Sequence, residues 1–124
     1  MAKNRNRDAG HAWEREVIND LKPLYPDAVS SRAESRNLDN KQVDICYTGD
    51  YHIQCKNSIT KPDYHKILKE MPNDKIQIIL HKYTQKADKN FITKGKYAIM
   101  YYSDFKILIE SLQYYENLVK NKEI

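Results

Sequence analysis

A carboxylate, an amide and an ammonium group are expected to meet on one face of a predicted β-hairpin. Residues 42–57 read QVDICYTGDYHIQCKN, two alternating runs that are joined by a turn. Because side chains alternate across a strand, Asp44 in the first run and Gln54 and Lys56 in the second lie on the same side. The apolar residues that mark the opposite, core side are Val43, Ile45 and Tyr47 in the first run, and Ile53 and Cys55 in the second.

The register of this hairpin decides whether the three polar groups meet, and the length of the loop sets the register. A two-residue turn would place Asp44 on the apolar face and bury its charge, so we reject it. A three-residue loop pairs Ile45 with Ile53 and keeps the two apolar faces together. In this register Asp44 lies opposite Gln54 and diagonal to Lys56. The hydrophobic pattern therefore predicts the three-residue loop.

Such a group of side chains suits the hydrolysis of a phosphodiester. A hard divalent cation such as Mg²⁺ prefers oxygen ligands and keeps several waters, so a few protein oxygens and a substrate phosphate suffice to hold it. We expect Asp44, the side-chain oxygen of Gln54 and the backbone carbonyl of Cys55 as ligands, with Mn²⁺ able to replace Mg²⁺. A bound metal activates water, and Lys56 would orient this water or offset charge in the transition state.

The motifs of this segment resemble those of a nuclease superfamily. The run D-I-C-Y-T-G-D-Y-H-I-Q-C-K is similar to the D…(D/E)xK signature of the PD-(D/E)XK nucleases. An earlier run, G-H-A-W-E-R-E, resembles the GxxxER start of archaeal and phage Holliday-junction resolvases. The order and spacing also agree, with Glu14 first, then Asp44, and then Gln54 and Lys56 ten and twelve residues later. The resemblance covers residues 10–57.

This resemblance implies a restriction-endonuclease-like α/β core with the element order α-β-β-β-α-β. By position, Asp44 would be the central metal-binding carboxylate and Lys56 the catalytic lysine. Glu14 would be a further acid that completes the metal shell directly or through water. Gln54 departs from the pattern, because the family most often has Glu or Asp there. Its amide still offers an oxygen but removes one negative charge, which makes Glu14 more important.

The resemblance also implies contacts to DNA. In those resolvases a Ser or an Arg near the second strand contacts the scissile phosphate. The residues of the matching region that are able to do so are Ser31, Arg32, Ser35 and Arg36, and the sequence does not choose among them. Further basic residues expected to contact phosphates are Lys3, Arg5, Arg7 and Lys41. Phosphate contacts carry no base sequence, so we expect nonspecific or structure-selective binding.

The elements that must position these residues follow from periodicity and punctuation. Asp8 can cap a helix that runs to about Leu24. Its buried stripe repeats every four residues, at Trp13, Val17 and Leu21. A short strand is expected at residues 28–32. The following polar run, AESRNLDNKQ, reads as a loop.

After the hairpin, a helix is expected at residues 61–71, capped by Thr60. Three further segments read as a buried strand, a polar connection and another strand: KIQIILHKYT, QKADKNFITKG and KYAIMYY. A last helix would run from Ser103 or Asp104 to about Lys120. The order α-β-β-β-α-β-β-α indicates an α/β sheet with helices on its faces. The restriction-endonuclease-like core would thus carry an additional strand and a C-terminal helix.

Composition limits the class of protein. The chain has 124 residues, which suits one domain, and we expect a basic flexible arm over residues 1–7 and a single nuclease domain over residues 8–124. No apolar run approaches the roughly 20 residues of a membrane span. The start of the chain lacks the apolar stretch of a secretory signal and only two cysteines are present, so a cytoplasmic location is expected. Residues 50–100 hold ten lysines against five acidic residues, which favours a polyanionic partner.

We therefore expect a Mg²⁺-dependent DNA endonuclease, and by resemblance a Holliday-junction resolvase that binds four-way junctions. Two strands must be cut, so a homodimer is implied, with the strand KYAIMYY or the C-terminal helix as its interface. One alternative keeps the chemistry in a nicking, repair or restriction-like nuclease on other DNA. Another alternative is a catalytically silent DNA-binding module, in which Gln54 marks a decayed site.

Overall fold

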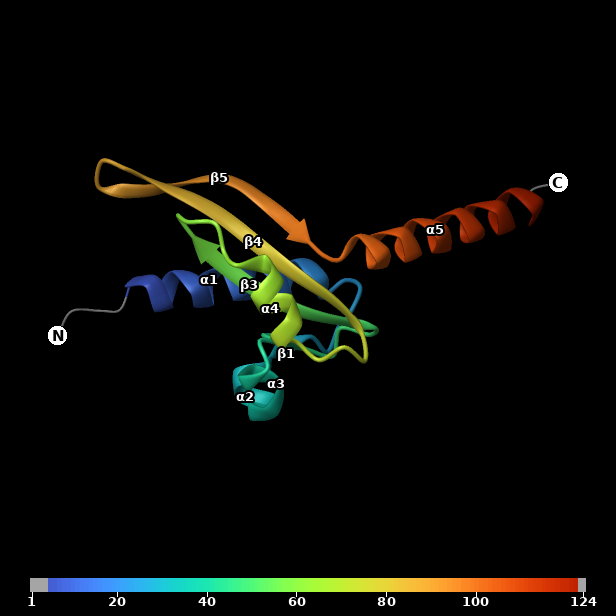
Figure 1. Ribbon diagram of the computed structural model, residues 1–124, viewed down its shortest axis with the longest axis horizontal. Coiled ribbons are helices and arrows are strands. Elements are labelled where there is room, and N and C mark those ends of the chain that lie inside the picture. The colour runs from blue at the N-terminus through green and yellow to red at the C-terminus, as the bar shows by residue number, and fades with distance from the viewer. Residues whose placement is uncertain (1–4, 123–124) are drawn as a thin grey trace.

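The computed structural model describes residues 5–122, with side chains from residue 7 onward. Figure 1 shows a twisted sheet with helices on both faces and one long helix that extends away from it. The elements are α1 (Arg5–Leu21), β1 (Val29–Ser30), α2 (Ser31–Glu34), α3 (Arg36–Asn40), β2 (Ile45–Cys46), β3 (Tyr51–Ser58), α4 (Tyr64–Glu70), β4 (Ile76–Ala87), β5 (Asn90–Ile99) and α5 (Tyr102–Lys122). The expected α/β class is confirmed.

The five strands form one mixed sheet in the order β1-β2-β3-β4-β5. All neighbouring pairs are antiparallel except β3 and β4, which run parallel. A parallel neighbour requires a crossover connection, because a tight turn can only reverse the chain. Residues 59–75 provide this crossover and contain α4. The sheet thus places the β2–β3 hairpin beside the long strand β4.

The register of the β2–β3 hairpin agrees with the sequence pattern. Ile45 lies opposite Ile53, as the three-residue loop requires. Within the loop, the Thr48 hydroxyl donates to the carbonyl of Tyr51 at 2.8 Å. Gly49 has φ of 63°, in the left-handed region that glycine adopts without a Cβ clash. The predicted pairing of Ile45 with Ile53 is therefore confirmed.

One feature of this hairpin differs from the expected alternation. The backbone N–H of Asp44 donates to the carbonyl of Ile53 at 2.8 Å, while Ile45 pairs with the same residue. Two residues thus oppose one, which is the arrangement of a β-bulge and resets the alternation of the side chains. Val43 accordingly packs on the other side of the sheet from Ile45. The prediction that these two side chains share one face is wrong. The prediction that Asp44 lies opposite Gln54 is also wrong, because Asp44 is bonded to Ile53.

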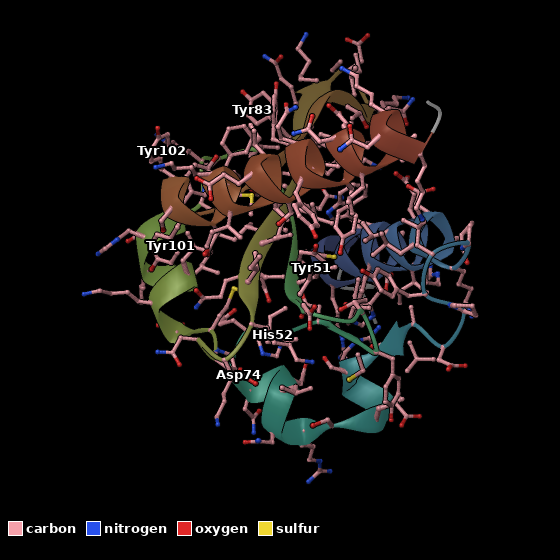
Figure 2. All side chains as sticks on the ribbon, turned by 90° about the vertical axis from the view of Figure 1, so that its right-hand side faces the viewer. Tyr51, His52, Asp74, Tyr83, Tyr101 and Tyr102 are labelled. Carbon is pink, nitrogen blue, oxygen red and sulfur yellow. The ribbon has the colours of Figure 1, made fainter. Side chains whose placement is uncertain are left out.

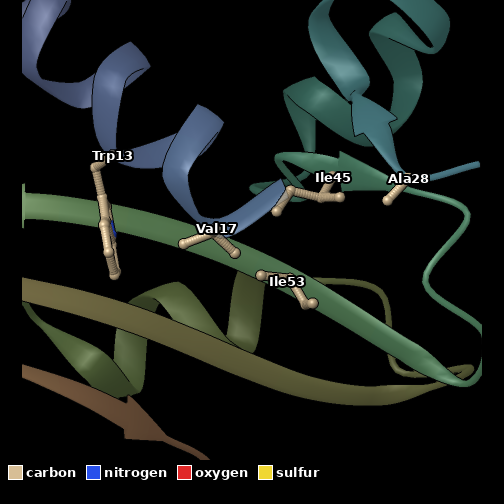
Figure 3. Packing of buried hydrophobic residues seen from close by; sticks show 5 residues of the cluster. All are labelled: Trp13, Val17, Ala28, Ile45 and Ile53. Atoms are coloured by element: carbon tan, nitrogen blue, oxygen red, sulfur yellow. The ribbon is translucent and has the colours of Figure 1, made fainter. Parts of the chain in front are cut away.

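Two apolar clusters cover the two faces of the sheet. Figure 3 shows the cluster under α1, which joins the helix to β2 and β3 through Trp13, Val17, Ala28, Ile45 and Ile53. The cluster under α4 contains Val43, Ile67, Leu68, Met71 and Ile79. The indole N–H of Trp13 also donates to the carbonyl of Leu80 at 3.0 Å. This hydrogen bond anchors α1 against the sheet. It therefore also holds Glu14, which follows Trp13, at the sheet.

The polar run AESRNLDNKQ is not a loop. It contains the last turn of α2 and all of α3, and each of these short helices starts at a serine cap. The Ser30 hydroxyl accepts from the N–H of Arg32 at 3.3 Å, and the Ser35 hydroxyl accepts from the N–H of Leu38 at 3.3 Å. A serine cap satisfies an N–H that the first turn leaves free, so a helix forms here despite the low apolar content.

The second half of the chain contains a further correction. The expected polar connection at residues 85–95 is mostly strand, because β4 continues to Ala87 and β5 begins at Asn90. The two strands form a hairpin whose outer part exposes both faces, so its sequence lacks the apolar alternation of a half-buried strand. Backbone pairing with β4, and not an apolar pattern, holds β5 in place.

The boundaries of three helices also differ from those expected. Helix α1 begins at Arg5 and ends at Leu21, so it extends into the expected arm and stops before Pro23. Helix α4 is capped by Asp63, whose carboxylate accepts from the N–H of Lys66 at 3.1 Å, and not by Thr60. Helix α5 is slightly longer than predicted at both ends. Within residues 5–122, no helix combines the length and apolar character required to cross a membrane.

Candidate active site

Three parts of the structure bring the four predicted catalytic residues toward one region of the sheet. Glu14 comes from the middle of α1, directly after the anchored Trp13. Asp44 lies at the bulge before β2, and Gln54 and Lys56 lie on β3. The bulge matters most for this arrangement, because it turns Asp44 toward the backbone of β3.

Asp44 is the centre of the site. Its Oδ2 accepts a hydrogen bond from the backbone N–H of Cys55 at 2.8 Å. The pKa of Asp44 is raised to about 7, chiefly by burial and also by the negative charge of Glu14. The hydrogen bond from Cys55 and the positive charge of Lys56 act in the opposite direction. The charged form of Asp44 is thus disfavoured in its surroundings, and Glu14 and Lys56 are close enough to influence its charge.

Glu14 is nearly fully buried, with 6% of its surface exposed. Its Oε1 lies 3.1 Å from the guanidinium nitrogen Nη2 of Arg32, in the short helix α2. The Arg32 side chain remains 40% exposed, so it links the buried carboxylate to the protein surface. Among the four Ser and Arg candidates for a phosphate contact, Arg32 is the one that the structure pairs with a predicted catalytic residue.

The amide of Gln54 is buried and faces acceptors. Its surroundings assign the NH₂ group to the end that points at Asp44, where it donates to Oδ2 at 3.1 Å and also contacts the carbonyl oxygen of Gln42. The side-chain oxygen, which we expected as a metal ligand, therefore points away from Asp44. A half-turn of the amide would be required to direct this oxygen at a cation held by Asp44.

Cys55 contributes its backbone N–H to Asp44, a contact that the sequence pattern does not reveal. Its thiol is largely buried, and burial raises the thiol pKa well above its usual value. The other cysteine, Cys46, is buried and also has a raised pKa for the same reason. Both thiols are free. Neither sulfur is therefore poised as a nucleophile at neutral pH.

The remaining predicted DNA contacts divide into buried, exposed and undescribed residues. Ser31 is fully buried, and its hydroxyl donates to the carbonyl of Val43. Ser35 is occupied as the cap of α3. The exposed residues are Arg7, Arg36 and Lys41. Arg5 begins α1, and Lys3 lies outside the described residues.

The sequence pattern did not indicate that two histidines, His52 and His81, are buried structural residues. The Nε2 atom of His81 lies 3.0 Å from the Ser58 hydroxyl, and burial lowers the His81 pKa. Figure 2 shows His52 beside Asp74, where Nε2 and Oδ1 are 2.8 Å apart. A signal for His81 exists in retrospect, because it continues the alternation of buried residues along β4 that starts at Gln77.

The donor set of the site fits a hard divalent cation with few protein ligands. Across residues 5–122, no group of three or more His, Cys, Asp and Glu side chains is placed to hold a metal ion. The site offers two carboxylates, Asp44 and Glu14, so further ligands must be amide or backbone oxygens, waters or substrate phosphate, as Mg²⁺ accepts. Neither a protein-family model, nor a curated protein, nor a solved structure matches the chain.

Proposed function

We propose that the protein is a metal-dependent DNA endonuclease with a restriction-endonuclease-like core. The observation that carries the proposal is the partly buried Asp44 carboxylate, held by the N–H of Cys55 and influenced by both Glu14 and Lys56. These residues come from segments far apart in the chain and match the order in the nuclease motif. A solvated strand residue would have no reason to be buried near a second carboxylate, because this raises the cost of its charge.

Each residue has a defined part in the proposed reaction. A bound Mg²⁺ ion supplies an activated water and neutralises charge on the phosphate. Asp44 and Glu14 would hold the cation, the side-chain oxygen of Gln54 would be a further ligand after a turn of its amide, and the backbone carbonyl of Cys55 would be the remaining one. Lys56 orients the attacking water or offsets charge at the phosphate.

Arg32 connects the site with the substrate. Its guanidinium is paired with Glu14 and partly exposed, so it can bind a phosphate oxygen when Glu14 turns toward the cation. The exposed Arg36 at the start of α3 and Lys41 at its C-cap are further candidates for phosphate contacts. We propose a four-way DNA junction as the substrate and a homodimer as the acting form, because one site cuts one strand and a resolvase must cut two.

The function is tested with a labelled four-way junction and a duplex that has the same arms. Purified protein is incubated with each DNA in Mg²⁺, in Mn²⁺ and in EDTA. The variant Asp44→Asn should lose cleavage and keep DNA binding. Asp50→Asn is the matched control, because it removes the same charge from an exposed turn of the same hairpin and should cleave normally.

The outcomes separate the proposals on substrate. Metal-dependent nicks confined to the junction, absent in Asp44→Asn, support the resolvase. Equal cutting of junction and duplex supports a nuclease on other DNA. Binding without cutting by the unaltered protein in either metal contradicts the endonuclease proposal.

A catalytically silent DNA-binding module is the second candidate, and one observation favours it. Both carboxylates are already satisfied by protein donors: Gln54 donates to Asp44, and Arg32 pairs with Glu14. Gln54→Glu separates the two candidates, since it restores the acid that the nuclease motif most often has. A gain in metal-dependent cleavage supports an enzyme that is weakened at this position. DNA binding without any cleavage supports the DNA-binding module.

A further inference from the structure

Helix α5 lacks a packing surface of its own in the monomer. It spans 21 residues, none of which is buried. Figure 1 shows it extending from the end of β5 away from the sheet. Its exposed large apolar residues, 39% to 79% accessible, are Tyr102, Phe105, Ile107, Ile109, Leu112, Tyr114, Tyr115, Leu118 and Val119. Most of the stability of a protein helix comes from packing of its apolar face, so this helix requires a partner surface.

Five residues form a continuous apolar seam along α5. Phe105, Leu108, Leu112, Tyr115 and Val119 are spaced by alternating intervals of three and four residues. This spacing keeps the side chains on one side of the helix and is the repeat by which one helix packs along another. A shallow hollow of about 430 Å³ lies on this side, lined by Leu112, Tyr115, Glu116, Val119 and Lys120.

We propose that α5 pairs with α5 of a second copy of this chain, in antiparallel orientation. The charges on the helix favour this orientation, because Asp104 lies in the first turn whereas Lys120 and Lys122 lie in the last. An antiparallel pair brings Asp104 of each helix close to Lys120 and Lys122 of the other, while Lys106 is paired with Glu110 of its own helix, with Nζ 3.9 Å from Oε1. A parallel pair would bring like charges together and align the two helix dipoles.

The spacing of the seam selects a symmetric register. A two-fold axis between Leu112 and Tyr115 packs Leu112 against Tyr115 of the second copy, and Leu108 against Val119 of the second copy. Each contact then occurs twice, as closed two-fold symmetry requires. Phe105 lies beside the methylene chain of Lys122 of the second copy. The methylene chain of a lysine can cover an aromatic ring while its ammonium group stays in water.

The area available is sufficient for a specific but reversible dimer. A buried aromatic side chain covers about 150–250 Å² and the rings on α5 are roughly half exposed, so the seam with its flanking residues buries on the order of 600 Å² per copy. The total of about 1,200 Å² is at the lower end of specific protein interfaces. We therefore expect an equilibrium between monomer and dimer that depends on concentration.

Strand β5, the other candidate interface, is less suited to pairing. It is an edge strand, and an unpaired edge invites a second strand. However, it carries Lys94 and Lys96 on an exposed stretch, and lysine on an edge is a common device against such pairing. Lys96 is also bound to Glu16 of α1, with Nζ 2.6 Å from Oε2. Pairing through α5 leaves this ion pair intact.

Sedimentation equilibrium of the full chain over a wide range of concentration tests the proposal. The unaltered protein should show a reversible monomer–dimer equilibrium, and Leu112→Glu should raise the dissociation constant by more than about tenfold, because a charge enters the centre of the seam twice. Gln113→Glu adds the same charge next to the seam and should leave the equilibrium within about twofold. Circular dichroism verifies that the sheet remains folded, as expected for a position that is 61% exposed in the monomer.

A charge exchange tests the orientation. In an antiparallel pair, Asp104→Lys faces Lys120 and Lys122 of the second copy and should weaken the dimer, and adding Lys120→Asp and Lys122→Asp should restore it. A parallel pair predicts no such rescue. A monomer at all concentrations, or equal weakening by Leu112→Glu and Gln113→Glu, overturns the proposal. These outcomes do not depend on DNA cleavage, so they are independent of the proposed nuclease function.

Discussion

At the scale of single residues, the site contains two carboxylates whose negative charges are compensated by other groups of the protein. Arg32 stabilises the buried Glu14 carboxylate, and the Cys55 N–H and Lys56 partly compensate Asp44. Removing one partner of a buried pair leaves an uncompensated charge, which costs more than the pair contributed. Such groups are costly for folding and are retained where a cation or substrate uses them.

The raised pKa of Asp44 makes a prediction about stability in the absence of metal. Its pKa is about 7 in the folded protein against 3.8 for the unperturbed group, so the native state binds the proton more tightly than the unfolded chain. The free energy of unfolding in EDTA should therefore fall as pH rises from about 4 to about 7, by on the order of 2–4 kcal/mol. Urea denaturation at a series of pH values measures this.

The variant Asp44→Asn isolates this effect. It should be more stable than the unaltered protein above pH 7 and should lose the fall in stability between the two pKa values. Asp50→Asn, on the exposed turn, should retain that fall. If both variants keep the same pH dependence as the unaltered protein, the Asp44 carboxyl is not the titrating group.

At the scale of the elements, the β2–β3 hairpin positions the site through its loop and its bulge. The loop needs Gly49, which has φ of 63° and whose added Cβ would lie 2.9 Å from the Tyr25 ring. The bulge needs the double pairing of Asp44 and Ile45 with Ile53. The hairpin thus fixes Asp44 against β3 by local geometry, with α1 supplying Glu14 from outside.

Replacing glycine by alanine should have opposite effects in this hairpin and in α1. Gly49→Ala should lower the free energy of unfolding by about 1–2 kcal/mol, because alanine is strained at positive φ. Gly10→Ala lies in a helix with open space around the new Cβ and should raise it by about 0.5–1 kcal/mol. Thermal or urea denaturation compares the two. Equal effects of both variants would contradict this account of the loop.

At the scale of the whole molecule, α5 and the candidate site lie on different parts of the chain. The two proposals are connected, because the dimer that α5 would form supplies the two sites that a resolvase needs. A single copy contains one candidate site. Antiparallel pairing of α5 about a two-fold axis would relate two sites by symmetry, as cutting two equivalent strands of a junction requires. The exposed helix and the domain that carries the candidate site would then act together.

The two proposals together predict a change in the products from a supercoiled plasmid that extrudes a cruciform. The dimer cuts both strands before it dissociates, so the unaltered protein should give linear DNA. Leu112→Glu should give mainly nicked circles at protein concentrations at which the unaltered chain is dimeric, since each monomer cuts once. Gln113→Glu should still give linear DNA. If a Leu112→Glu protein that sediments as a monomer still gives linear DNA, then cutting of both strands does not depend on pairing through α5.

The sequence by itself determined features that depend on local pattern. Alternation of apolar residues was sufficient to give the register of Ile45 against Ile53, because only one loop length keeps both apolar faces together. The spacing of Glu14, Asp44 and Lys56 indicated which polar residues to consider. Helical periodicity also located α1 and α5 to within a few residues. The sequence pattern missed the outer part of the β4–β5 hairpin, which was expected as a polar connection, since its exposed strands carry no apolar signal.

Only the tertiary structure decided which of these groups touch. The choice of Arg32 over its neighbours depends on how α2 lies against α1, and eighteen residues separate Arg32 from Glu14. The direction of the Gln54 amide depends on acceptors from Gln42 and Asp44, which converge through the bulge. A bulge is set by the pairing of two strands and not by the residue types of one. Local periodicity constrains each element, whereas contacts between elements arise when burial and hydrogen bonding are satisfied together.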